Sequence, residues 1–340
     1  MARSAEEAIA SNKQWMRRLR VVMEMEEWVA GNLKKKGEFD TRDRSKDVLL
    51  AKGKEYFYGY LFWGRRVFSD SDDPLFFDDD GNGEINDGSL IYQLKTRELY
   101  NKFIEKLREL KQNMMMVDVE KEKTVNHTDI KRFVNDDQSK RMISFLETNL
   151  PNTSSKDHEI IGLILRYRCV GGFESNLHGS VTAEWASKFQ GYTECFASPL
   201  NHKFEAFHSV FEEDRVFGGQ GDFFKMVNEN DGVLPSGNYE INPPFHSALL
   251  DQVAAIVDRS FKRNVANLKI VMVVPVWSDT IFIPLLDNVC KSLGDRGYVC
   301  NERYSYNHTN GRPLSANTNF YFLASNDIPV DDFFNLSQIV

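Results

Sequence analysis

Between residues 192 and 325 short apolar runs alternate with helical patterns, and this alternation constrains the fold more than any other feature. The runs, punctuated by Gly, Pro and Asn, cover residues 192–201, 237–245, 268–277, 298–306 and 317–325. Residues 246–263 and 280–293 carry helical spacing between them. Apolar strands joined by helices are typical of a parallel sheet covered on both faces. We therefore predict an α/β body, with the last two runs as an antiparallel pair at the sheet edge.

The first half of the chain is predicted to be mostly helical. Over residues 5–36 apolar side chains recur at steps of three and four: Trp15, Leu19, Val22, Met25, Val29 and Leu33. Further helices are predicted over residues 46–67, 89–113, 128–149 and 155–169. We expect a helical N-terminal domain over residues 1–155 and an α/β domain over residues 156–340.

Composition narrows the class of protein. No run approaches the roughly 18 uncharged apolar residues that a membrane helix needs, and the N-terminus lacks the apolar segment of a secretory signal. The cysteines form no CxxC pair, which favours reduced thiols in an intracellular protein and no zinc site: Cys169, Cys195, Cys290 and Cys300. The net charge of −8 argues against indiscriminate nucleic-acid binding.

An acidic loop at residues 78–89 resembles a calcium-binding EF-hand loop. Asp78, Asp80 and Asn82 occupy its first, third and fifth positions, followed by Gly83. The twelfth position, which should supply a bidentate Glu, is Ser89. We interpret the loop as an acidic surface turn, with a weak calcium site as the alternative.

The tetrapeptide Asn242-Pro243-Pro244-Phe245 follows a predicted strand and opens a helix, where α/β sheets bind ligands. The Asn side-chain oxygen and a carbonyl held by the proline pair offer two acceptors. Two acceptors suit a planar amine such as N6 of adenine, and Phe245 can stack on the base. Methyl transfer from a sulfonium to that amine needs alignment and electrostatic preorganisation. The alternative is an ordinary strand-to-helix turn whose prolines start the helix.

Two other turns are candidate cofactor sites. ECFASPLN (194–201) ends the first strand of the body, and its backbone and Asn201 suit the amino-acid tail of a cofactor. In FGGQGDFF (217–224), the glycines permit close backbone approach, and Asp222 offers an acceptor for a ribose hydroxyl or an adenine amine. Either segment alone also fits a plain turn.

The order of these motifs is ECFASPLN, FGxxG with a nearby DF, NPPF, a strand ending in P-x-W, and NT before the final strand. This order resembles that of the phosphorylated-CTD-interacting-factor family. Its members are S-adenosylmethionine-dependent methyltransferases that act on N6 of the cap-adjacent adenosine of mRNA. The resemblance runs from about Leu163 to Asn326. It implies a Rossmann-like methyltransferase sheet, mostly parallel with an antiparallel edge strand, preceded by a helical domain.

The resemblance also implies roles for individual residues. Asn242, Pro243 and Phe245 would hold the target adenine, and Pro244 would fix the turn. The expected cofactor residues are Glu194, Ala197, Ser198, Asn201 and Asp222. The expected substrate residues are Trp277 and Asn317 in the pocket wall, and Arg166, Arg168 and His178 near the cap or its triphosphate. For these last three, ordinary surface or helix-end positions are the alternative. No metal is expected.

Two departures from the family bear on function. No WW module is visible, since Trp15, Trp28 and Trp63 lie in helical patterns, and Val276 stands where an acid is expected between Pro275 and Trp277. We expect N6-methylation of the cap-adjacent 2'-O-methyladenosine of mRNA, with the 7-methylguanosine-capped 5' end as partner and no membrane. The alternatives are an N6-adenine methyltransferase on DNA or internal RNA, and an inactive scaffold that binds RNA or proteins. A protein partner is expected at the helical half. The resemblance implies the nucleus, with the cytoplasm as the alternative.

Overall fold

The computed structural model describes eleven stretches of the chain. They are residues 5–35, 101–102, 105–106, 109–110, 153–169, 180–181, 183–245, 247–278, 280–302, 306–307 and 317–329. The helices predicted over residues 46–67 and 128–149, most of that over 89–113, and the acidic loop 78–89 lie outside them. Residue contacts divide the chain into two compact units, of which the first holds α1 (Ala5–Lys35) and α7 (Thr153–Cys169).

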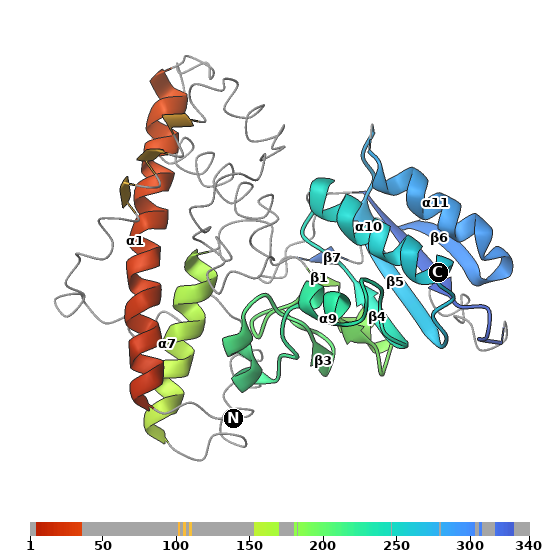
Figure 1. Ribbon diagram of the computed structural model, residues 1–340, viewed down its shortest axis with the longest axis horizontal. Coiled ribbons are helices and arrows are strands. Elements are labelled where there is room, and N and C mark those ends of the chain that lie inside the picture. Colours follow the sequence, from red (N-terminus) through yellow and green to blue (C-terminus); the bar gives the residue numbers. More distant parts are fainter. Residues whose placement is uncertain are drawn as a thin grey trace. The chain divides into compact units, whose positions relative to one another are not determined.

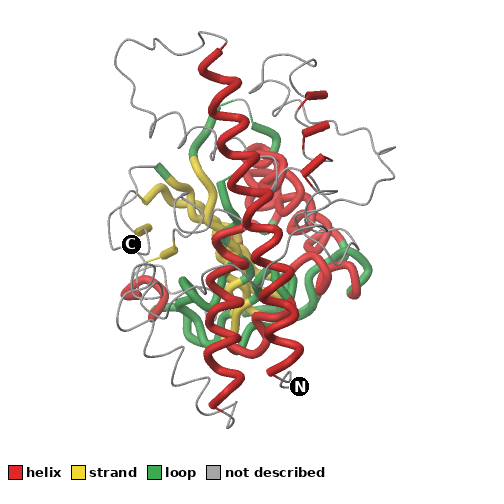
Figure 2. The backbone as a smooth tube through the Cα atoms, turned by 90° about the vertical axis from the view of Figure 1, so that its left-hand side faces the viewer, coloured by secondary structure: helices red, strands yellow, loops and turns green. Residues whose placement is uncertain are grey.

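The helical unit is built on close packing of α1 against α7, which lie side by side in both ribbon views (Figures 1 and 2). The Asn12 side-chain amide donates a hydrogen bond of 2.8 Å to the carbonyl of His158. A Cβ atom on Gly162 would lie 2.5 Å from Asn12 Oδ1, so glycine is needed for this approach. Trp15 and Met25 are fully buried on α1. The helices predicted over residues 5–36 and 155–169 are confirmed, and α7, which spans the domain boundary predicted at residue 155, packs with α1.

The second unit holds a mixed six-stranded sheet of order β3-β2-β4-β5-β8-β6. Its strands are β2 (Thr193–Glu194), β3 (Ala206–Phe207), β4 (Gly237–Ile241), β5 (Leu268–Pro275), β6 (Gly297–Glu302) and β8 (Thr318–Ala324). The first four in spatial order run parallel, and β8 is antiparallel to both β5 and β6. A separate antiparallel ladder joins β1 (Ser180–Val181) to β7 (Tyr306–Asn307). The predicted α/β body is confirmed.

The antiparallel pair predicted at the sheet edge is present, but the reversed strand, β8, is not the edge strand. It lies between β5 and β6, and β6 forms the edge. Burial explains this order, because all five residues from Phe320 to Ala324 are 0% exposed and need neighbours on both sides. Val299 on β6 is 39% exposed, as suits an edge.

Helices cover both faces of this sheet. On one face Trp185 of α8 (Ala183–Ser187) packs against Phe320, with ring centroids 5.0 Å apart. On the other face the Tyr321 hydroxyl donates a 2.8 Å hydrogen bond to Asp287 of α11 (Phe282–Ser292). Helix α10 (Ser247–Lys262) lies beside α11 (Figure 1). These two helices confirm the predictions over 246–263 and 280–293. The remaining elements are α9 (Phe223–Glu229), η6 (Glu212–Phe217) and η7 (Gly294–Arg296).

Among the described residues, no helix combines the length and apolar character that crossing a bilayer requires.

Candidate active site at the ends of β2 and β4

The direction of sheet winding reverses between β2 and β4. From β2 the chain moves outward to β3, and it then returns to place β4 on the other side of β2. Ligands of open α/β sheets bind at the carboxyl ends of strands at such a reversal. Residues 195–201 and 242–245 begin at these two strand ends, where Glu194 is the register partner of Glu240. The structure therefore brings together two motifs that lie more than 40 residues apart in the sequence.

Asn242 carries a buried acceptor at this point. Its side chain is 6% exposed, and Oδ1 has no hydrogen-bond partner among the described residues. A buried polar atom without a partner costs about 1–3 kcal/mol, so such atoms usually mark an ordered water, a ligand or a catalytic role. A group that donates hydrogen bonds would satisfy it.

Aromatic rings line the same edge of the sheet. Phe245 is partly buried, and its ring lies edge-on to Trp277 at a centroid distance of 6.5 Å. Trp277 follows the end of β5 and is 40% exposed. The amide of Val276 donates to the carbonyl of Asn317 at 2.9 Å, because β8 starts where β5 ends. Both predicted pocket-wall residues thus lie at the strand ends beside the NPPF turn.

In the turn after β2, the side chains that were predicted to bind a cofactor form hydrogen bonds within the turn. The Glu194 carboxylate accepts hydrogen bonds from the backbone amides of Lys203 at 2.7 Å and Phe204 at 3.3 Å. Asn201 Oδ1 accepts from the amide of Ser198 at 2.8 Å and from its hydroxyl at 2.7 Å. Glu194, Ser198 and Asn201 are all buried. Their contact with a cofactor stays a prediction, and the observed bonds give each of them a role in shaping the turn.

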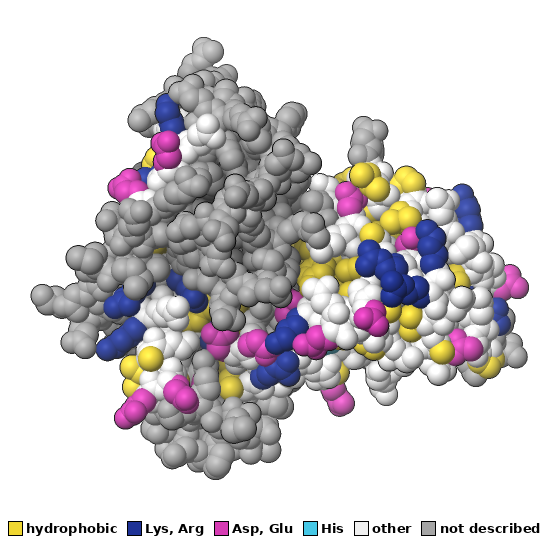
Figure 3. Space-filling model, viewed as in Figure 1, with side chains coloured by type: hydrophobic (Ala, Val, Ile, Leu, Met, Phe, Trp, Pro, Cys, Tyr) yellow, Lys and Arg dark blue, Asp and Glu magenta, His cyan; other side chains and the backbone are white. Residues whose placement is uncertain are grey.

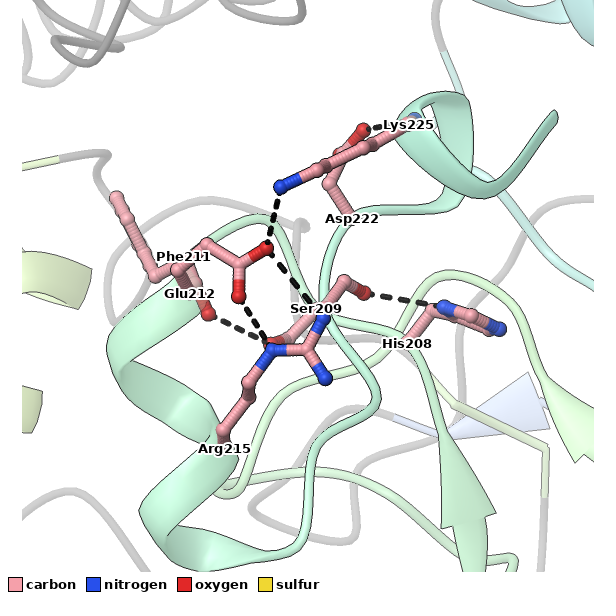
Figure 4. A network of polar contacts seen from close by, with 8 residues as sticks. His208, Ser209, Phe211, Glu212, Arg215, Asp222 and Lys225 are labelled. Carbon is pink, nitrogen blue, oxygen red and sulfur yellow. Dashed lines mark hydrogen bonds and ion pairs between the residues drawn. The ribbon is translucent and has the colours of Figure 1, made fainter. Parts of the chain in front are cut away.

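The two predicted cofactor segments touch each other. The rings of Phe196 and Phe223 lie 4.7 Å apart, so residues 194–201 and 217–224 share an aromatic contact. The amide of Ala197 donates to the carbonyl of His208 at 3.0 Å, and His208 Nδ1 lies 3.1 Å from the carbonyl oxygen of Gly221 (Figure 4). His208 thereby links the two segments.

The glycine-rich turn is explained by its own packing. Gly221 has a φ of 95°, and a Cβ atom there would lie 2.5 Å from Arg215 Nη2. The Asp222 side chain caps α9 by accepting from the amide of Lys225 at 2.8 Å. Glu212 pairs with both Arg215 and Lys225 across this turn (Figure 4). The plain-turn interpretation accounts for these contacts, and a cofactor contact through Asp222 stays a prediction.

Three buried carboxyl groups near the strand ends have raised pKa values. Burial raises the pKa of Glu194 to about 7 and that of Asp222 to about 6. Burial, with the nearby Glu194 charge, raises the pKa of Glu240 well above its ordinary value. Each of the two carboxyl groups thus raises the cost of charging the other.

Of the basic residues predicted to contact the cap, the structure describes the side chain of Arg166 alone, and all three contacts stay predictions. Arg166 is fully buried within α7 of the helical unit. The Arg168 side chain and His178 lie outside the described part, as do Asp78, Asp80 and Asn82. Within the described ranges, no group of three or more His, Cys, Asp and Glu side chains could hold a metal ion.

Glu240 and His208 were missed by the sequence interpretation. A signal was present for Glu240, because a carboxyl group inside the apolar run ending in Ile241 must be buried together with the strand. His208 gave no comparable signal, since the two-residue strand β3 that precedes it is too short for a pattern.

Comparison with known proteins gives matches to this part of the chain. Residues 146–311 match the family described as "Phosphorylated CTD interacting factor 1 WW domain". Over 90 residues the chain is 33% identical to human mRNA (2'-O-methyladenosine-N(6)-)-methyltransferase and 32% identical to the mouse protein of the same name. Each of these alignments covers 25% of this chain and 12% of the relative.

The matched segment carries the candidate site. It contains β2, β4, β5 and the NPPF turn of the α/β unit, and also α7 of the helical unit. The resemblance predicted from the sequence is confirmed, since residues 146–311 match the model of the phosphorylated-CTD-interacting-factor family.

Proposed function

We propose that this chain is an S-adenosylmethionine-dependent methyltransferase that modifies N6 of adenosine in RNA, at the cap-adjacent 2'-O-methyladenosine of mRNA. The observation that carries the proposal is the buried, unpartnered Oδ1 of Asn242 at the winding reversal, with Phe245 beside it. The names of the human and mouse relatives agree with this chemistry.

The residues present fit an amine-holding site. The N6 amine of adenine has two N–H donors, and Asn242 Oδ1 with the carbonyl of Pro243 would accept them. Held in this way, the amine lone pair is drawn out of conjugation with the ring and is free to attack. Phe245 would stack on the base, and Trp277 would close the pocket wall.

S-adenosylmethionine, when bound, supplies an electrophilic methyl group on a sulfonium. The N6–C bond forms as the C–S bond breaks, and the extra amine proton leaves to solvent. The residues that would hold the cofactor are Glu194, Ala197, Ser198, Asn201 and Asp222. The contact between the two turns that carry them supports a single cofactor wall. Alignment and a preorganised acceptor then account for the acceleration.

A mixed sheet whose winding reverses between β2 and β4 supports the finer assignment as a Rossmann-like methyltransferase sheet. On the face shown in Figure 3, described acidic and basic side chains are interspersed over the α/β unit. Such a surface suits recognition of an RNA end better than tracking of a long duplex, which favours a continuous basic groove. A terminal adenosine also reaches the pocket at low unstacking cost.

Partners and location follow from the same proposal. Capped mRNA is the proposed ligand, and the helical half is the proposed contact for a protein partner. A nuclear location would match co-transcriptional capping, and a cytoplasmic one would serve transcripts that are capped there.

The test is methyl transfer from labelled S-adenosylmethionine to short RNAs that begin with 2'-O-methyladenosine, with and without a 7-methylguanosine cap. We expect label in N6,2'-O-dimethyladenosine, from capped RNA only. Equal transfer without the cap would move the substrate to internal RNA, and transfer to DNA oligonucleotides alone would move it to DNA. No transfer together with no cofactor binding would leave a scaffold and refute the proposal.

A further inference from the structure

We infer that Glu240 is a positioning residue, which orients the Asn242 side chain so that Oδ1 is left free for the substrate amine. This inference rests on the proposed function, because it assigns the control of the amine-binding atom. Nothing in the NPPF motif itself identifies Glu240, which lies two residues before it.

The backbone places the two side chains together. Residues two apart along an extended strand face the same side, and Asn242 directly follows Ile241, the last residue of β4, so extended backbone at this point places its side chain on the side of Glu240. Glu240 is 0% exposed and Asn242 is 6% exposed. Hydrogen bonding by the Asn242 side chain acts on the Glu240 carboxyl and opposes the effect of burial on its pKa. Neither Glu240 oxygen has a hydrogen bond of regular geometry within the described part of the chain.

Donor chemistry decides which end of the amide faces Glu240. A carboxylate can only accept, whereas a side-chain amide has two N–H donors on Nδ2 and an acceptor at Oδ1. An ionised Glu240 therefore attracts Nδ2 and leaves Oδ1 available. A protonated Glu240 can instead donate to Oδ1 and occupy the atom that the substrate needs.

The surroundings of Glu240 supply few other charges. Its register partner on β5 is the apolar Val271. Its partner on β2 is Glu194, and both carboxyl groups act electrostatically on the thiol of the next residue, Cys195. Lys203 acts on Glu194 through its charge and its backbone amide. On the face that Val271 shares, the aromatic cluster adds Tyr192 as a buried titratable side chain. Glu194 is therefore the titratable group that acts most directly on Glu240.

Two substitutions and their combination distinguish an effect of Glu240 on the orientation of the Asn242 side chain from an effect on protein stability. In Glu240→Gln, the new amide can donate to Asn242 Oδ1, so the single-turnover rate should fall about 10-fold. In Asn242→Asp, the new carboxylate should repel Glu240 and lower the rate as well. In the double variant, the amide introduced at position 240 can donate to one oxygen of the carboxylate introduced at position 242, while the other oxygen accepts the substrate amine. The rate of the double variant should therefore exceed that of either single variant.

The experiment measures single-turnover methyl transfer to capped RNA at saturating cofactor for wild type, the two single variants and the double variant. Cofactor affinity and thermal unfolding are measured for the same four proteins. Glu229→Gln, an exposed carboxyl on α9, is the matched control and should match wild type. Recovery in the double variant supports the inference, because a residue with a purely structural role would give additive losses. Additive losses, or a wild-type rate in Glu240→Gln, would overturn it.

A measurement that does not depend on methyl transfer distinguishes failure of this inference from failure of the proposed function. In protein labelled with ¹⁵N at asparagine, the Asn242 side-chain amide signal is identified by its loss in Asn242→Asp. Its shift should move with pH in wild type and in Glu194→Gln, and stay fixed in Glu240→Gln. A fixed signal in wild type would overturn the inference. A moving signal in a protein that methylates no RNA would support Glu240 while the proposed function fails.

Discussion

The turns that follow β2 and β4 start side by side, yet they satisfy their polar groups in opposite ways. After β2, the side-chain oxygens of Glu194 and Asn201 accept hydrogen bonds from backbone amides and a hydroxyl of the same turn. After β4, Asn242 Oδ1 is buried with no partner among the described residues. The first turn is thus held by its own hydrogen bonds, and the second carries a buried acceptor that a ligand or water would satisfy. A binding site can be recognised by this contrast more surely than by glycine content.

The difference between the two turns should be visible in the free energy of unfolding. Asn201→Ala removes an acceptor for two buried donors of Ser198 and should lower the free energy of unfolding by about 1–3 kcal/mol. Asn242→Ala removes an atom that is already unpaired, so its loss should be clearly smaller. Urea unfolding followed by circular dichroism measures both. Equal losses would show that the two turns do not differ in this respect.

The buried carboxyl of the first turn should make stability depend on pH. The pKa of Glu194 rises from the ordinary 4.5 to about 7 on folding, so the folded state favours the protonated acid. The stabilisation is complete below the unfolded pKa and is lost as pH rises through the folded value. We expect wild type to lose roughly 1–3 kcal/mol between pH 5 and pH 8.

Glu194→Gln should reduce that dependence, because its neutral amide cannot ionise, while Asp222 and Glu240 still contribute. Asp258→Asn, on an exposed ion pair with Lys262, is a control that leaves the slope in place. An unchanged slope in Glu194→Gln would assign the pH dependence to other groups.

The smallest expected effect lies in the pocket wall. Trp277→Ala removes a 40% exposed ring that touches Phe245 and Phe282, so base stacking should weaken. Stacking on an aromatic side chain contributes about 1–3 kcal/mol per base, and partial loss predicts a several-fold rise in KM for RNA at little change in kcat. Ile281→Ala, at a 70% exposed neighbouring position, should leave KM unchanged. A fall in kcat alone would place Trp277 in alignment of the reacting groups.

Elements with a strong local hydrophobic pattern were predictable from sequence. The run from Leu268 to Pro275 and the pattern over 246–263 became β5 and α10, and the NPPF turn follows β4 as expected. The inner position of β8 depends on pairing with strands that are remote in sequence. No local pattern encodes that choice.

The site was predictable at the level of motifs but not of atoms. Residue types predicted acceptors at Ser198, Asn201 and Asn242, but only tertiary structure shows which of them are already occupied. The same holds for Glu240, because the partner facing a buried carboxyl is fixed by packing and strand register.

The most direct measurement is the single-turnover rate of methyl transfer to capped RNA by Asn242→Ala at saturating S-adenosylmethionine, with cofactor affinity measured in parallel. Loss of a preorganised hydrogen-bond group in an active site typically costs about 100- to 1,000-fold in rate. We predict a loss of that size with cofactor affinity within about twofold of wild type, because the substitution removes the acceptor for the amine and none of the residues proposed to hold the cofactor. A rate equal to that of wild type, with label still in N6 of the first adenosine, would contradict the assignment of Asn242 as the residue that holds the substrate.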